Sequence, residues 1–232
     1  MKNTEEVALI VGAGDGLSAS LARLFASEGM KLGLVARDAE KLGALCNELG
    51  AERFSCDASQ PEAVLRLFDE VDARLGLPEV VVYNPSYRTR GALVDLDPAD
   101  VAKALAVTAY GGFLVGQQAA KRMLQKGQGA ILFTGASASV KGYAQSAPFA
   151  MGKFALRGLV QSMARELAPK NIHVAHFVID GAILPPGQPN SPDNSDSFLD
   201  PDAIAQTYLH VLRQHRSAWT WEIELRPWTE RF

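Results

Sequence analysis

Hydrophobic positions along the chain alternate between short apolar runs and longer segments with helical spacing. The apolar runs predict strands near Val7–Val11, Lys31–Ala36, Arg53–Cys56, Glu79–Tyr83, Ala130–Thr134, Ile172–Ile179 and Thr220–Leu225. The helical segments fall near Leu17–Ser27, Ala39–Leu49, Pro61–Leu75, Pro98–Gln125, Ala147–Leu167 and Pro201–Gln214. Such alternation predicts a single α/β domain over residues 1–232, built on a doubly wound parallel sheet with both faces covered by helices.

One segment interrupts this alternation. Leu184–Asp200 is rich in Pro, Ser, Asn and Asp and has neither strand nor helix spacing. Long loops inside compact domains often cover a ligand, which favours a mobile substrate loop here. A loop without a role is the alternative interpretation.

Composition and charge exclude several classes of protein. The 232 residues carry a formal charge of −3, without the basic surface that nucleic-acid binding needs. Two cysteines, Cys46 and Cys56, are too few for a disulfide scaffold. The polar N-terminus and the lack of a long apolar run predict a cytoplasmic protein without a membrane segment.

A glycine-rich segment lies between the first predicted strand and the first predicted helix. It reads Gly12-Ala13-Gly14-Asp15-Gly16-Leu17. Glycines there let the backbone approach a pyrophosphate, and the following helix N-terminus offers free N–H groups and a positive dipole end. The position predicts a Rossmann-type dinucleotide site; a tight turn without a ligand is the alternative.

This segment resembles the nucleotide loop of the short-chain dehydrogenase/reductase family, with Val11 in place of a usual Thr and Ser18 in place of the last Gly. Asn84-Pro85-Ser86 resembles the family's Asn-Ala-Gly. The resemblance implies an NAD(P)-dependent oxidoreductase for a small carbonyl or alcohol substrate. The cofactor-binding residues that it implies are Gly12, Gly14, Asp15, Gly16, Leu17, Arg37, Asp57, Asn84 and Lys153.

The end of the second strand bears on the choice of cofactor. Ala36 stands where NAD-binding sites have an acidic residue, and Arg37 follows it. Arg is a good bidentate partner for the extra phosphate of NADP, so NADP is favoured and NAD stays possible. Asp15 argues the other way, because NADP-preferring relatives often have a basic residue there.

The family's catalytic positions are mostly occupied by inert side chains. The segment Ser146–Leu156 resembles the family's Tyr-x-x-x-Lys helix, with Lys153 retained and Phe149 in place of Tyr. By the same resemblance, Ala136 replaces the Ser and Thr108 replaces the Asn. Because Phe has no titratable proton, the usual proton transfer cannot come from residue 149.

Two functions are therefore open. One is a short-chain oxidoreductase in which Lys153 is retained and Ser137, Tyr143 or a water supplies the proton. The other is a catalytically silent dinucleotide-binding protein, a sensor or a partner subunit. Arg88 and Arg90 are interpreted as exposed loop residues, with an anionic substrate as the alternative.

Other constellations are not predicted. His173 and His176 fall on opposite faces of one strand and make no metal pair, and no Ser-His-Asp or Cys-His arrangement is assigned.

The family resemblance also implies a homodimer or homotetramer. Apolar residues are abundant on the helices near Pro98–Gln125 and Ala147–Leu167, and three tryptophans lie in the last segment.

Overall fold

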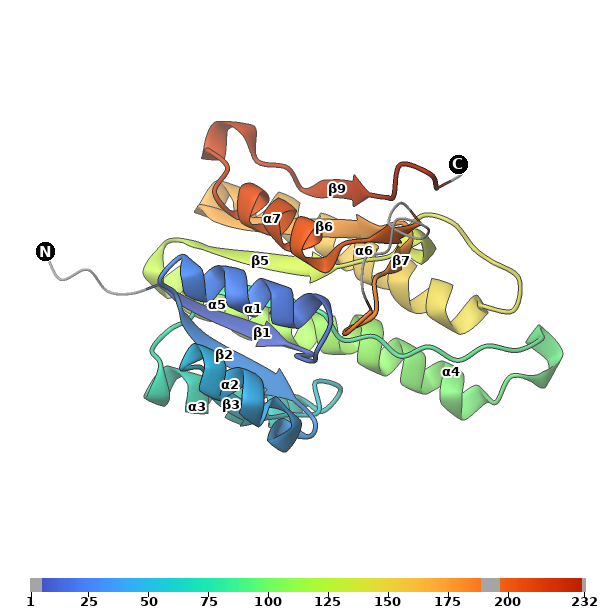
Figure 1. The fold of residues 1–232 in the computed structure, drawn as a ribbon, viewed down its shortest axis with the longest axis horizontal. Helices are drawn as coiled ribbons and strands as arrows, with labels where there is room; N and C mark the ends of the chain where they lie inside the picture. Colours follow the sequence, from blue (N-terminus) through green and yellow to red (C-terminus); the bar gives the residue numbers. More distant parts are fainter. Residues whose placement is uncertain (1–5, 189–196, 231–232) are drawn as a thin grey trace, which may run out of the picture.

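The computed structural model describes residues 6–188 and 197–230 (Figure 1). Within these residues, seven parallel strands form one sheet in the order β3-β2-β1-β4-β5-β6-β9. The strands are β1 (Val7–Val11), β2 (Lys31–Ala36), β3 (Glu52–Ser55), β4 (Val80–Tyr83), β5 (Gly129–Thr134), β6 (Ile172–Ile179) and β9 (Glu222–Leu225). The predicted doubly wound parallel sheet is confirmed.

Helices cover both faces of the sheet, and each face has its own hydrophobic core. One core packs α1 (Leu17–Ser27), α2 (Gly43–Leu49) and α7 (Pro201–Leu212) on the sheet. The other packs α3 (Pro61–Arg74), α5 (Gly111–Lys126) and α6 (Ala147–Leu167), while α4 (Pro98–Leu105) lies against α6. Short 3-10 turns are Ala39–Leu42, Leu93–Asp95, Ser137–Ser139, Ala168–Lys170 and Arg216–Ala218.

The helix expected over Pro98–Gln125 is divided. A π-helical turn, Ala106–Tyr110, separates α4 from α5. Its widened backbone leaves the carbonyl of Val107 to accept a hydrogen bond from the hydroxyl of Tyr83 on β4. Gly111 lies against the same hydroxyl, which a Cβ atom there would approach within 2.4 Å. Hydrophobic spacing could not reveal this turn, since it depends on a contact with a distant strand.

A short strand pair lies where the segment expected to be a loop, Leu184–Asp200, begins and ends. The two-residue strands β7 (Ala182–Ile183) and β8 (Phe198–Leu199) pair at its base. Residues 189–196, the middle of the expected substrate loop, lie outside the described residues.

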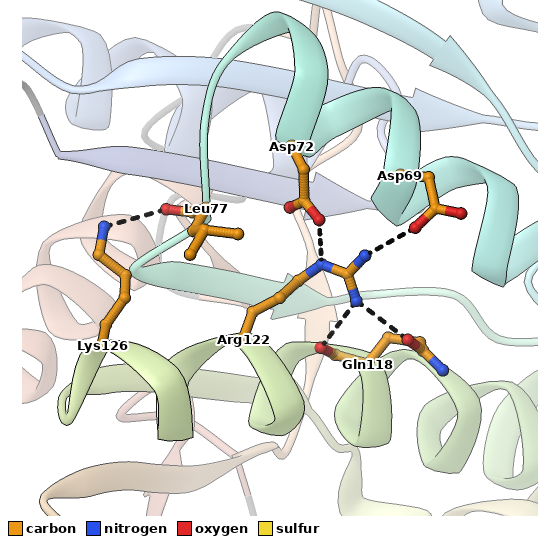
Figure 2. Close-up of polar contacts among 6 residues, drawn as sticks. All are labelled: Asp69, Asp72, Leu77, Gln118, Arg122 and Lys126. Carbon is orange, nitrogen blue, oxygen red and sulfur yellow. Dashed lines mark hydrogen bonds and ion pairs between the residues drawn. The ribbon is translucent and has the colours of Figure 1, made fainter.

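An ion cluster ties α5 to α3 on the outer side of the domain (Figure 2). Arg122 is only 8% exposed and contacts the carboxylates of Asp72 at 2.7 Å and Asp69 at 3.0 Å. Burial raises the pKa of Asp72, and the guanidinium of Arg122 opposes that rise. Gln118 also accepts from Arg122, which fixes the guanidinium between the two helices.

The strand order places the ends of β1 and β4 side by side. Their pairing brings Val11 opposite Tyr83, so the loops after these strands start together. The chain leaves β1 toward β2 and leaves β4 toward β5, on opposite sides. This is a topological switch point, where open α/β sheets hold their ligands.

Candidate active site

A cavity of about 690 Å³ opens at the carboxyl-terminal edge of the sheet. Most of its lining comes from the segments 11–15, 35–38, 56–59 and 84–87, which follow β1, β2, β3 and β4. The loops that carry the predicted cofactor residues therefore meet at one place.

The glycines of the first loop have different surroundings. Gly12 has a positive φ of +82°, and a Cβ atom there would lie 2.7 Å from the backbone nitrogen of Pro85. A side chain at this position is therefore excluded twice, by conformation and by space. Gly14 and Gly16 face open space, with no described atom within 4 Å of a Cβ built on either residue. These two positions leave the backbone open to a group as large as a pyrophosphate.

Ser18, where the family resemblance expects Gly, links the first loop to the fourth. Its hydroxyl donates to the carbonyl of Gly12 at 3.0 Å and accepts from the Asn84 side-chain amide at 2.7 Å. The Asn84 backbone N–H donates to the carbonyl of Val11 at 2.9 Å. Asn84 thus has a structural partner, Ser18, that the sequence analysis missed; a small hydroxyl just after a glycine turn was its only signal.

Helix α1 begins directly after the segment 11–15 that lines this cavity. Its N-cap, Gly16, makes no side-chain cap, and the first turn of this helix has no acidic residue. An uncapped helix start next to a glycine turn attracts a phosphate through its N–H groups and dipole. The residues present therefore fit a dinucleotide.

The side chains at the far end of the cavity are charged. Arg37 is exposed and, among the described residues, has no ion-pair partner within salt-bridge distance. Neighbouring Asp38 lies 3.4 Å from the ammonium of Lys41. Asp57 accepts from the hydroxyl of Ser59 at 2.7 Å and from its backbone N–H at 3.0 Å, and these bonds lower the pKa of Asp57.

Lys153 lies deep beside the sheet rather than on a solvated helix face. Its side chain is 2% exposed, and its ammonium donates to the carbonyl of Thr134 at 2.7 Å. The same nitrogen lies 5.9 Å from the ring centre of Phe149, which is 7% exposed. Burial, with a smaller contribution from the charge of Arg88, lowers the pKa of Lys153 to about 7.

Arg88 is exposed, as expected, but it is not a free loop residue. Its guanidinium carbon lies 4.3 Å from the ring centre of Phe149. Desolvation and the neighbouring charge of Arg90 lower its pKa. The structure therefore adds Arg88 to the pair of Phe149 and Lys153, a neighbour that the sequence did not reveal.

Thr108 anchors the loop that carries Arg88. It is fully buried in the π-helical turn, and its hydroxyl accepts from the backbone N–H of Tyr87 at 3.3 Å. The hydroxyl of Tyr87 bonds Asp100 on α4 at 3.0 Å. A second tie joins the N–H of Gly91 to the carbonyl of Gln145 at 3.2 Å.

The two alternative proton donors lie in different settings. Ser137 begins the 3-10 turn directly after Ala136, and its carbonyl accepts from the N–H groups of Val140 and Lys141. Tyr143 is 47% exposed, and the Lys141 ammonium lies 5.9 Å from its ring centre.

A Ser-His-Glu arrangement exists that the sequence analysis did not assign. His176 lies 3.4 Å from the Ser139 hydroxyl through Nε2 and 3.0 Å from the Glu222 carboxylate through Nδ1. Ser139 and His176 are fully buried, and the same hydroxyl accepts from the backbone N–H of Ala136. The Ser139 hydroxyl is engaged by the His176 ring and the Ala136 N–H, so the group supports the backbone at Ala136. The sequence could not reveal this group because its three residues come from three separate elements and form no contiguous motif.

Comparison with known proteins decides the family. The family model described as "short chain dehydrogenase" matches residues 6–189. The chain belongs to the short-chain dehydrogenase family. Members of this family bind NAD(P) and act on carbonyl or alcohol substrates.

Individual relatives agree with this assignment. The (21S)-21-acetoxyl-apo-melianone synthase SDR of Melia azedarach is 31% identical over 174 residues, which cover 73% of this chain. The chain spans 64% of that relative's length. A crystal structure of a short-chain dehydrogenase from Rhodopseudomonas palustris is 36% identical, covers 96% of this chain and 99% of its own, and has a TM-score of 0.83.

A second solved structure carries a cofactor. It is a metagenomic short-chain oxidoreductase in complex with NADP, 27% identical to this chain. The match covers 96% of this chain and 97% of that one, with a TM-score of 0.82.

None of the helices in residues 6–188 and 197–230 is long and apolar enough to cross a bilayer. In the same residues, no group of three His, Cys, Asp or Glu side chains is arranged to hold a metal.

Proposed function

We propose that the chain is an NADP(H)-dependent oxidoreductase for a carbonyl or alcohol substrate, in which Lys153 carries the proton. The observation that supports this most is the position of the lysine. Its ammonium is buried beside Phe149 and bonded to the carbonyl of Thr134. A lysine whose pKa lies at about 7 exchanges a proton easily near neutral pH.

The chemistry supplied by a bound nicotinamide is hydride transfer to or from the substrate carbon. In the direction of reduction, the ammonium of Lys153 donates its proton to the carbonyl oxygen and becomes neutral. Burial favours the neutral amine that this step leaves behind. In the direction of oxidation, the neutral amine accepts the hydroxyl proton.

The preference for NADP is a separate part of the proposal. Arg37 is exposed beside the cavity and has no carboxylate within ion-pair distance in the described part of the chain, although its charge helps to lower the pKa of Asp57, so its guanidinium is available to a phosphate. Ala36 brings no negative charge to repel that phosphate. The NADP complex of the metagenomic relative supports the same choice.

A direct assay tests the proposal. Purified protein is titrated with NADPH and NADH, and consumption of each is then followed with a panel of aldehydes, ketones and oxo acids. We expect tighter binding of NADPH and turnover of at least one carbonyl compound. Tight NADPH binding with no turnover by any compound would instead favour the silent dinucleotide-binding protein, the function that inert Phe149 and Ala136 suggest.

We also propose that the chain forms a homodimer or homotetramer. Large apolar side chains are exposed on adjoining helices: Tyr110, Phe113, Met151 and Phe154. Two of the three tryptophans pack within the subunit, Trp219 against His173 and Trp221 against the core, whereas Trp228 is 80% exposed. Light scattering tests this: a mass of 24.9 kDa that does not rise with concentration excludes the oligomer.

A further inference from the structure

We propose that Arg88, held on the face of Phe149, binds an anionic group of the substrate, with a carboxylate as the class that fits best. The inference rests on the proposed carbonyl chemistry and names its class of substrate. In this proposal Phe149 has a function of its own, because its ring positions the guanidinium of Arg88.

The guanidinium of Arg88 lies over the ring of Phe149, and its N–H groups have no hydrogen-bond acceptor among the described residues. A guanidinium is planar, and contact with an aromatic ring uses its face. Its N–H donors point outward in the plane, in the fork that matches a carboxylate. Within the described residues, no carboxylate lies within ion-pair distance of Arg88, whereas Arg122 and Arg157 each hold one or two.

The surrounding charge also favours an anion. Arg90 is two residues from Arg88, and the buried ammonium of Lys153 lies 5.9 Å from the centre of the same Phe149 ring. Three cations brought together without a compensating carboxylate repel one another, and a bound anion relieves that repulsion. The lowered pKa of Arg88 follows from the same desolvation and crowding.

The loop is built to hold this arginine still. Tyr87 is fixed by Thr108 through its backbone and by Asp100 through its hydroxyl. The ammonium of Lys103 lies 4.6 Å from the Tyr87 ring centre. Preorganisation of this kind lowers the entropy that a bound ligand must overcome.

The position separates a substrate site from the cofactor site. Ser86 and Tyr87 line the cavity at the switch point, whereas Arg88 lies outside its lining and on Phe149 instead. The cofactor's pyrophosphate is the other possible anion, and the test distinguishes the two.

The test uses acids and their methyl esters on NADP⁺-saturated protein. Pyruvate, acetoacetate and levulinate, each with its methyl ester, are titrated by calorimetry, so that binding is read without turnover. We expect at least one acid to bind about tenfold or more tightly than its ester. In Arg88→Gln the affinity for that acid should fall by about ten- to a hundredfold, while the affinity for its ester should stay unchanged.

Two comparisons complete the design. Arg216→Gln is the matched control, because Arg216 is exposed and precedes β9, at the opposite edge of the sheet. Phe149→Leu removes the aromatic ring under Arg88 and should lower the affinity for the acid. Phe149→Tyr keeps an aromatic ring and should keep that affinity.

Each further outcome decides a separate question. Equal binding of acids and esters, or acid binding that Arg88→Gln leaves intact, would overturn the anion site. So would a loss of NADP⁺ affinity in Arg88→Gln as large as the loss of acid affinity, since the anion would then be the cofactor. Acid binding that depends on Arg88 without any NADPH consumption would keep the anion site and refute the proposed oxidoreductase. Turnover of carbonyl compounds without a preference for acids would support the oxidoreductase and refute the anion site.

Discussion

The cofactor cavity and the group around Phe149 lie at the same edge of one sheet, yet they depart from the family pattern in different ways. In the cavity, Ser18 in place of a usual Gly bonds to Gly12 and Asn84, so the departure is absorbed into the structure. Around Phe149, the departures remove hydroxyls and bring in a cation from a different loop.

The difference follows from what each region must supply. Dinucleotide binding relies on backbone N–H groups, a helix start and open space, which several side chains allow. Proton transfer needs a titratable atom at one place, and Phe offers none. We therefore propose that the sheet keeps its dinucleotide-binding function under these substitutions and that Lys153 takes over the proton transfer.

The strongest test of the cofactor cavity is to replace Gly12. We expect Gly12→Val to destabilise the protein by a few kcal/mol and to abolish NADPH binding, because the new side chain meets Pro85 and a φ of +82° disfavours it. Thermal unfolding and fluorescence titration measure the two effects. Gly14→Ala is the control: its Cβ faces open space, so stability should change little. Full NADPH affinity in Gly12→Val would refute our account of the loop.

The group around Phe149 is tested by restoring the two hydroxyls that the family has at positions 149 and 136. We expect Phe149→Tyr with Ala136→Ser to raise carbonyl reduction by about a hundredfold, because a phenol beside Lys153 becomes the general acid. The turnover rate at saturating NADPH measures this. The single variants separate the two contributions. A double variant that is slower than an already active wild type would show that another donor is used.

The buried lysine also affects stability. We expect Lys153→Met to raise the free energy of unfolding by a few kcal/mol below about pH 7, where the folded protein holds a buried charge. As pH rises from about 7 toward the unfolded value of 10.5, the folded state loses the proton before the unfolded state does. The wild type then gains stability, and the difference between the two proteins shrinks.

Urea unfolding at several pH values checks this expectation. Lys170→Met, on an exposed lysine, is the matched control. A difference between Lys153→Met and wild type that does not change with pH would mean that folded and unfolded states hold the same number of protons on Lys153, so that folding does not lower its pKa.

The smallest effect is expected at Arg37. We expect Arg37→Gln to reduce the preference for NADPH over NADH by about tenfold, because an exposed guanidinium makes a bond partly screened by solvent. Equilibrium titration with both cofactors measures the ratio. Arg66→Gln, on the exposed side of α3, is the control. Equal affinities for NADPH and NADH in the wild type would refute the preference itself.

Hydrophobic spacing predicted the alternation of strands and helices along the chain, and it placed most element bounds within a few residues. It could predict the glycine loop as well, because that loop is contiguous in sequence. It could not predict the π-helical turn, the Arg88–Phe149 stack or the Ser139–His176–Glu222 group. Each of these depends on side chains from separate elements, and only the packed sheet brings them together.

The pH dependence of carbonyl reduction tests the central claim most directly. Turnover at saturating NADPH is measured across neutral pH for the wild type, Phe149→Tyr and Lys153→Met. If Lys153 donates the proton, the wild-type rate should fall as pH rises through about 7, and Lys153→Met should lose most activity at every pH. A wild-type rate independent of pH together with an active Lys153→Met would contradict the account.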